Sequence, residues 1–258
     1  MTSQLAWVGV LVLCLHAAEP APAQRLWEQG QDALRDGRTD EAMQLYQKSL
    51  ALDPEFADDH LSLAACYLDK GDDQQAGQEL ARYLESRPHH CSVRAHYAEL
   101  LVRLNRVHAA RLQYERLDAE AQDQDAQVQQ ELVHYQSRLM QLAEMEDDDF
   151  AAHLHRGIGL YLLARQQAAL PEDECGYPPE SLLCKAAGEL ILASRERPDE
   201  ARPCWYLFAV WSQLAQRQPA ARWLRQAEAG SPFSYLTPAE RRGLETAVHS
   251  QDAEARRK

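Results

Sequence analysis

Residues 33–54 (ALRDGRTDEAMQLYQKSLALDP) and residues 67–88 (YLDKGDDQQAGQELARYLESRP) share a pattern whose columns repeat 34 positions apart. The same spacing extends into a third stretch, where an asparagine replaces the glycine. The columns are the glycine or asparagine at Gly37, Gly71 and Asn105, the alanines Ala42, Ala76 and Ala110, the larger side chains Tyr46, Leu80 and Tyr114, and the prolines Pro54 and Pro88. Several columns in one register indicate an internal repeat.

Each column has a physical role. Glycine or asparagine ends a helix because both tolerate the left-handed backbone conformation. The alanine lets a second helix pack closely on the first, and the larger side chain four positions later lies on the same helical face. Proline stops the second helix. The pattern therefore predicts two helices joined by a turn in every 34 residues.

The composition of the 258-residue chain favours helices throughout. Ala, Leu, Gln, Glu and Arg are abundant and are good helix formers, whereas runs of Val, Ile and Thr are nearly absent. The net charge of −13 argues against a nucleic-acid partner, because clusters of Lys and Arg hold a phosphate backbone. The one basic run, 256–258, lies at a terminus. We expect an all-α fold and no binding to nucleic acid.

The pattern resembles the tetratricopeptide repeat, a 34-residue helix–turn–helix unit of the form W-x2-L-G-x2-Y…A-x3-F…P. The corresponding positions are Leu26 and Gly30 in the first unit, His60, Leu63, Ala64 and Tyr67 in the second, and Arg94, Tyr97, Ala98 and Leu101 in the third. The third unit departs from the pattern at Gln122, where a proline is expected. The resemblance implies a right-handed α-solenoid of about five repeats.

The register returns near the C-terminus. Pro198 and Pro232 are 34 apart, and Ala186-x3-Leu190 and Ala220-x3-Leu224 precede them at the expected offsets. The unit before Pro198 is split. Its first helix is predicted at 150–165, with Gly157 or Gly159 as the close-packing residue, and its second helix starts near Ser181. The proline-rich segment between them predicts an inserted loop.

Two further helices complete the predicted organisation. Apolar side chains recur at helical spacing within 125–148, which predicts an amphipathic helix outside the repeats, either separate from the preceding helix or continuous with it over 106–148. Thr237-Pro238-Ala239-Glu240 predicts a capping box and a terminal helix to about His249. The predicted order is a signal peptide at 1–23, three repeats at 24–124, the linking helix at 125–148, two repeats at 149–236 with an inserted loop at 166–180, and a capping helix with a basic tail at 237–258.

The N-terminus differs in kind from the repeats. Nine apolar residues, 7–15, precede the small-x-small pattern Ala21-Pro22-Ala23, which is typical of a signal peptidase site with Gln24 as the new N-terminus. The apolar run is too short to span a bilayer. We expect an exported protein, located in a periplasm or cell envelope or secreted. Because residues 1–4 carry no Lys or Arg, an apolar tail is the alternative.

No complete catalytic signature is present, such as a Gly-rich phosphate loop, G-x-S-x-G, H-E-x-x-H or C-x2-C. We expect a protein without enzymatic activity, cofactor or bound metal. The alternative is a transition-metal site formed by His89, His90, Cys91 and His96, since imidazole and thiolate are suitable ligands. In the acidic run at 144–149, Asp148 or Asp149 is expected to cap the following helix.

Cleavage after Ala23 would leave five cysteines, Cys66, Cys91, Cys175, Cys184 and Cys204. An odd number leaves at least one thiol unpaired. Cys184 has two candidate partners, Cys175 in the inserted loop and Cys204, and the alternative is that the cysteines are small buried side chains.

In the tetratricopeptide family the first helices of successive repeats line a groove that binds peptides or protein segments. Carried onto this sequence, the groove residues are Trp27, Gln31, Leu34, Arg35, Leu61, Ala65, Leu68, Ala95, Glu99, Val102 and Arg103 in the first block, and Trp205 and Ala209 in the second. Members that grip a chaperone's C-terminal carboxylate use Lys, Asn and Arg, whereas those places here hold Trp27, Gln31, Ser62, Ser92 and His96.

The resemblance therefore implies a scaffold for a protein or peptide partner other than a chaperone C-terminus. Self-assembly into a homo-oligomer, through the apolar face of the helix at 125–148, is the structural alternative. No membrane span is expected after cleavage of the signal.

Overall fold

The structure is a computed structural model that describes residues 21–121, 126–171 and 175–255. Every regular element within these ranges is a helix, which confirms the all-α prediction. The helices are α1 (Pro22–Arg35), α2 (Thr39–Leu52), α3 (Ala57–Asp69), α4 (Asp73–Ser86), α5 (Cys91–Arg103), α6 (Val107–Ala121), α7 (Ala126–Met145), α8 (Asp149–Ala168), α9 (Pro179–Glu196), α10 (Ala201–Gln213), α11 (Arg217–Gly230) and α12 (Pro238–Ala255). None of the helices in these ranges combines the length and apolar character that a membrane span requires.

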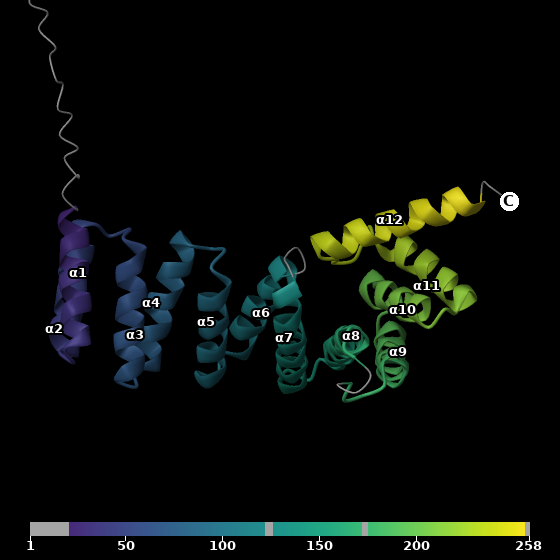
Figure 1. The fold of residues 1–258 in the computed structure, drawn as a ribbon, viewed down its shortest axis with the longest axis horizontal. Coiled ribbons are helices and arrows are strands. Elements are labelled where there is room, and N and C mark those ends of the chain that lie inside the picture. Colours follow the sequence, from purple (N-terminus) through teal and green to yellow (C-terminus); the bar gives the residue numbers. More distant parts are fainter. Residues whose placement is uncertain (1–20, 122–125, 172–174, 256–258) are drawn as a thin grey trace, which may run out of the picture. The chain divides into compact units, whose positions relative to one another are not determined.

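The chain forms two units, residues 1–86 and residues 87–258, which are described separately. Unit 1 contains α1–α4 and unit 2 contains α5–α12. The division falls within the segment predicted as three repeats. In each unit the neighbouring helices form hairpins (Figure 1). The N-terminal segment predicted as a signal lies, up to residue 20, outside the described residues.

One turn geometry recurs at five places. Gly37, Gly71, Asn105, Asp147 and Ala215 all have a left-handed φ, between 55° and 77°. In each case the next amide donates a hydrogen bond to the carbonyl five positions before it, the bond that closes a helix at a left-handed residue. The sequence predicted the first three turns, since glycine and asparagine tolerate this conformation.

The turn at Asp147 joins α7 to α8 as a helix–turn–helix pair. Ala143 and Ala152 are buried there. They have the same sequence separations from Asp147 as Ala33 and Ala42 have from Gly37. The segment 125–148, predicted as a linking helix outside the repeats, therefore has the turn and the small residues of a repeat. Within the described residues α6 and α7 are separate helices.

Helix α8 also pairs with α9, across the inserted loop. A Cβ on Gly157 would come within 2.6 Å of Leu190 Cγ, and a Cβ on Gly30 would come within 2.4 Å of Tyr46 Cε1. The first helix of each pair thus has a glycine where the large side chain of the second helix lies. Helix α8 belongs to two pairs, since it also follows the turn at Asp147.

The ends of several helices follow the predicted chemistry. Asp148 accepts a hydrogen bond from Ala151 N at 3.1 Å and is the cap of α8. Glu240 accepts from Thr237 N at 2.8 Å, and Thr237 Oγ1 accepts from Glu240 N at 3.3 Å, which confirms the capping box. Helix α8 continues to Ala168 instead of residue 165, and α12 continues to Ala255, beyond His249.

Candidate functional site

The predicted groove face of unit 1 is held together by polar contacts between α1 and α3. Trp27 Nε1 and Gln31 Nε2 both donate to Ser62 Oγ, at 3.1 and 2.9 Å. The Trp27 ring also packs edge-on against Phe56, with the centroids 6.3 Å apart. Trp27, Gln31 and Ser62 are three of the places that the sequence analysis compared with a carboxylate clamp, and their polar groups bond to one another.

The other predicted residues of unit 1 differ in exposure. Leu34 and Leu61 are partly buried, and Arg35 is exposed and pairs with Asp32 at 2.6 Å. Ala65 and Leu68 are exposed on α3, with 38% of Leu68 accessible. Ala65 and Leu68 are therefore the apolar groove residues that a partner of unit 1 can reach.

In unit 2, the predicted groove residue Glu99 joins three helices. Its carboxylate accepts from Arg138 Nε at 2.7 Å and from Tyr114 OH at 2.5 Å. Burial alone would raise the pKa of Glu99, but these hydrogen bonds bring the pKa below its ordinary value. Ala95 and Val102 pack against the hydrophobic core formed by α5, α6 and α7. Of the four predicted groove residues on α5, only Arg103 is exposed. Glu99 is therefore a structural residue of α5.

The two predicted groove residues of the second block, Trp205 and Ala209 of α10, line a cavity of about 190 Å³. Tyr161 and Arg165 of α8 line its other side. Helix α12 covers part of Trp205, since a Cβ on Gly243 would come within 2.8 Å of the indole Cζ2. The structure thus brings both residues to one concave surface and closes part of it with the terminal helix.

A buried network of charged groups, which the sequence did not reveal, lies beside this cavity. The Arg202 guanidinium donates to Glu240 Oε1 at 2.9 Å and to Asp118 Oδ2 at 2.5 Å. Tyr206 OH also donates to Glu240, and Gln136 Nε2 donates to Asp118 Oδ1 at 2.6 Å. Burial lowers the pKa of Arg202, but Glu240 and Asp118 outweigh it and raise the pKa well above its ordinary value.

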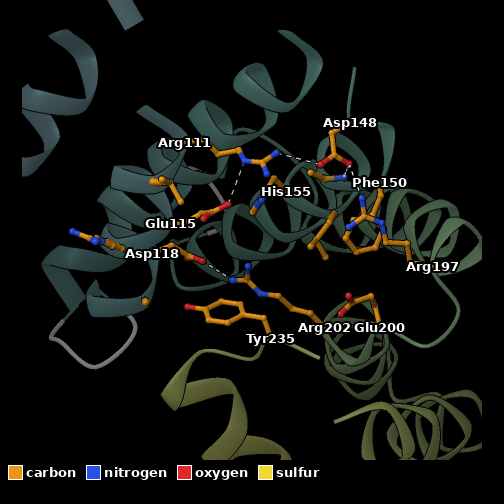
Figure 2. Close-up of a pocket in the computed structure, with 15 residues that line it drawn as sticks. Arg111, Glu115, Asp118, Asp148, Phe150, His155, Arg197, Glu200, Arg202 and Tyr235 are labelled. Atoms are coloured by element: carbon orange, nitrogen blue, oxygen red, sulfur yellow. Dashed lines mark hydrogen bonds and ion pairs between the residues drawn. The ribbon is translucent and has the colours of Figure 1, made fainter. Parts of the chain in front are cut away.

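A second and larger cavity, of about 420 Å³, has Arg202 in its lining (Figure 2). We call it the α6–α8–α10 cavity after the helices that supply most of its walls. Its lining residues are Arg111, Leu112, Glu115, Arg116, Asp118, Ala119, Asp148, Phe150, Ala151, Leu154, His155, Arg197, Glu200, Arg202 and Tyr235.

Ion pairs fix two arginines at the rim of the α6–α8–α10 cavity. Arg111 bonds to Asp148 at 3.2 Å and to Glu146 at 2.8 Å. Arg197 bonds to Asp148 at 3.3 Å and lies 4.2 Å above the Phe150 ring. Asp148 therefore holds both guanidiniums while it caps α8.

His155 is the buried imidazole of the α6–α8–α10 cavity, with 5% of its surface exposed. Its Nδ1 lies 2.7 Å from Gln136 Oε1, and Gln136 uses its amide nitrogen to donate to Asp118. The Gln136 oxygen must therefore accept, which places the proton on His155 Nδ1. Burial lowers the pKa of His155 well below its ordinary value, and the positive charges of Arg202 and Arg111 lower it further, so the imidazole is neutral.

The proposed metal ligands are not gathered. Among the residues that the structure describes, no three His, Cys, Asp or Glu side chains are placed to hold a metal ion. Cys91 Sγ donates to Glu120 at 3.4 Å and lies 3.6 Å from the carbonyl of His89. The alternative of a metal site at 89–96 has no support from this geometry.

The five cysteines of the described residues are all free thiols. Cys204 is buried and Cys184 is exposed, so neither bridge that the sequence suggested for Cys184 is formed. Burial raises the pKa of Cys204 to about 11, as expected for a small buried side chain without a charged partner.

Comparison with known proteins gives one family match. Residues 33–92 match the family model for the tetratricopeptide repeat. This range runs from the end of α1 through α2, α3 and α4 to the start of α5. No curated protein sequence matches the chain.

Solved structures with some likeness include PilF of Pseudomonas aeruginosa, at 19% identity over 87% of this chain and 97% of that chain, with a TM-score of 0.38. A type IV pilus biogenesis factor, PilW, is 15% identical over 88% of this chain and 98% of its own, with a TM-score of 0.37. YrrB, a repeat protein with an unusual peptide-binding site, is 15% identical over 82% and 87%, with a TM-score of 0.35. Scores of this size carry no information about how this chain works.

Proposed function

We propose that this chain, in which residues 33–92 are tetratricopeptide-repeat sequence, is an exported scaffold without enzymatic activity that binds a protein or peptide segment. The repeat is a protein-interaction module, and the match to it is the observation that carries the proposal. The matched range contains α3, whose groove face exposes the apolar residues Ala65 and Leu68. An exposed apolar face on a repeat helix is the kind of surface that a partner segment covers.

The binding surface is tested by a matched pair of leucines in unit 1. Leu68 lies on the groove face of α3, and Leu52 is 60% exposed at the end of α2. Cross-linked pull-down from the native source, with mass spectrometry, should recover a protein partner with wild type and with Leu52→Glu but not with Leu68→Glu. Equal capture by both variants would refute the groove assignment. Recovery of the chain alone would favour self-assembly over partner binding.

Export is supported by the sequence pattern at Ala21-Pro22-Ala23. The intact mass of protein made in a secreting host should correspond to a chain that begins at Gln24. Ala23→Leu should block cleavage because signal peptidase needs a small residue there, whereas Ala18→Leu should be cleaved as usual. An exported protein of full-length mass would overturn the predicted cleavage.

A further inference from the structure

The charged groups of the α6–α8–α10 cavity differ in how fully they are paired with opposite charges. Three of its arginines, Arg111, Arg197 and Arg202, are bound to carboxylates. Glu146 and Glu240 lie outside the lining but neutralise Arg111 and Arg202. The lining itself has four carboxylates and four guanidiniums, one of which is the exposed Arg116. Together with Glu146 and Glu240, the charged groups in and next to the cavity sum to −2.

Two carboxylates of the lining, Glu115 and Glu200, are weakly paired or unpaired among the described residues. Glu115 touches only Arg111 Nε, at 3.4 Å, and burial raises the pKa of Glu115 although Arg111 opposes the rise. Glu200 lines the opposite wall, where its side chain makes no hydrogen bond or ion pair with the described residues. Each is a half-buried carboxylate that a cation in the cavity would stabilise.

His155 gives an independent indication of a ligand. Its Nδ1–H is used by Gln136, so Nε2 carries a lone pair. Nε2 has no hydrogen-bond partner among the described residues, although the side chain is almost fully buried. Figure 2 shows His155 on the same side of the cavity as Glu115 and Arg111. An acceptor atom on a buried side chain that lines a cavity, with no donor from the described residues, fits a ligand that brings an N–H group.

The remaining lining is apolar. Leu112, Phe150 and Leu154 are among the lining residues, and Tyr235 is largely exposed. Long basic side chains combine an aliphatic stem with a charged end that donates hydrogen bonds. The cavity has a counterpart for each of these two parts. Its apolar lining suits the stem, and its carboxylates and imidazole acceptor suit the charged end.

We propose that the α6–α8–α10 cavity is a docking site for a lysine or arginine side chain of a partner protein. The stem of this side chain lies along Leu112, Leu154 and Tyr235. Its cationic end donates to Glu115 and His155 Nε2, and Glu200 on the opposite wall adds negative charge. The proposal rests on the proposed scaffold function for the source of the side chain, but it concerns unit 2, whereas α3 belongs to unit 1.

The test uses the full chain and four probes, the N-acetyl N-methylamides of lysine, arginine, norleucine and glutamate. Binding is followed by the NMR resonances of the His155 imidazole. The lysine or arginine probe should shift His155 saturably and bind at least roughly 10-fold more tightly than norleucine, because hydrogen bonds between charged groups contribute about 1.5–3 kcal/mol. Norleucine has the same stem as lysine and no charge.

Two variants and one control make the assignment specific. Glu115→Gln should weaken binding of the basic probe by roughly 10-fold, for the same reason, and Glu200→Gln should weaken it by a smaller factor. Glu245→Gln removes an exposed carboxylate of α12 and should leave binding unchanged. Equal binding of norleucine, preferred binding of the glutamate probe, or equal effects of all three variants would overturn the proposal.

The two proposals can fail separately. If the basic probes do not bind and both Glu115→Gln and Glu200→Gln still capture a partner, the basic-residue site is refuted and the scaffold function is not affected. If the chain binds the basic probes but captures no partner, the scaffold function is refuted and the basic-residue site is supported.

Discussion

Arg202 of α10 and Glu240 of α12 form a buried two-point contact, with Arg202 Nε 2.9 Å from Oε1 and 3.1 Å from Oε2 of the carboxylate. The same guanidinium reaches Asp118 of α6, which is 84 residues earlier in the chain. Only 7% of the Arg202 side chain is exposed. One guanidinium therefore pairs with two buried carboxylates on different helices and links α12 to α6.

Arg202→Met should destabilise unit 2 by about 3–5 kcal/mol, because it leaves Asp118 and Glu240 buried without a counter-charge. Urea unfolding followed by tryptophan fluorescence measures the loss. Arg197→Met is the control, since 51% of the Arg197 side chain is exposed and an exposed ion pair contributes about 1 kcal/mol or less. Adding Asp118→Asn and Glu240→Gln to Arg202→Met should recover most of the loss. Similar losses for the two arginines would contradict this account.

Gly157→Ala should lower the free energy of unfolding by about 1–3 kcal/mol, because its Cβ would lie 2.6 Å from Leu190 Cγ and 3.3 Å from the carbonyl oxygen of Ala186. Gly188→Ala, on the facing helix α9, meets nothing within 4 Å and should raise the stability by up to about 1 kcal/mol through helix propensity. Thermal unfolding of the two variants should give shifts of opposite sign. Shifts of the same sign would show that α8 and α9 do not pack at Gly157.

Ala215→Gly should stabilise the turn between α10 and α11 by about 0.5–1 kcal/mol, because Ala215 has φ 55° and a Cβ is unfavourable in that conformation. The reverse change at Gly37, with φ 77°, should cost about 1 kcal/mol in unit 1. Chemical denaturation of both variants checks the pair. A loss for Ala215→Gly would mean that the turn does not hold the left-handed conformation.

Asp59 of α3 is a fully buried carboxylate, and neither of its oxygens has a hydrogen-bond partner among the described residues. Burial raises its pKa to about 6, although Ser49 and His60 oppose the rise. The Ser49 hydroxyl donates to the carbonyl of Ala23 at 2.8 Å. Because the folded chain holds this proton more tightly than the unfolded chain, stability should fall as the pH rises from about 4 to 6.

Asp59→Asn should therefore raise the free energy of unfolding at pH 8 by on the order of 1–3 kcal/mol and bring little gain at pH 4. Asp69→Asn, an exposed substitution near the end of the same helix, keeps Asp59 and should lose stability between about pH 4 and 6 as the wild type does. Unfolding measured at several pH values separates the two. A gain for Asp59→Asn that does not depend on pH would argue against an ionised Asp59 as the cause.

The sequence predicted those parts of the fold in which a residue type is required by the backbone. Gly37, Gly71 and Asn105 mark turns because few other residues tolerate their φ. Asp147 and Ala215 adopt the same turn with residue types that give no such signal. A signal was nevertheless available, because Asp147 and Ala215 are 68 residues apart, twice the repeat length, and Ala143 and Ala152 flank Asp147 as in the other turns.

The candidate site was less predictable. Groove positions follow from the periodicity, and Trp205 and Ala209 do line a cavity. Side-chain pairing does not follow from it, so Glu99 was expected to face a partner but bonds to Arg138 and Tyr114. The residues around Arg202 come from α6, α7, α8, α10 and α12, and no local pattern relates them.

The position of Glu240 also sets the order in which unit 2 matures during synthesis. Asp118 and Arg202 emerge first, and Arg202 lacks one of its two carboxylate partners until the start of α12 has been made. A nascent chain without this segment pairs Arg202 with Asp118 alone, and Tyr206 has no Glu240 to which it can donate. The packing around Arg202 should therefore be completed only after Glu240 has been synthesised.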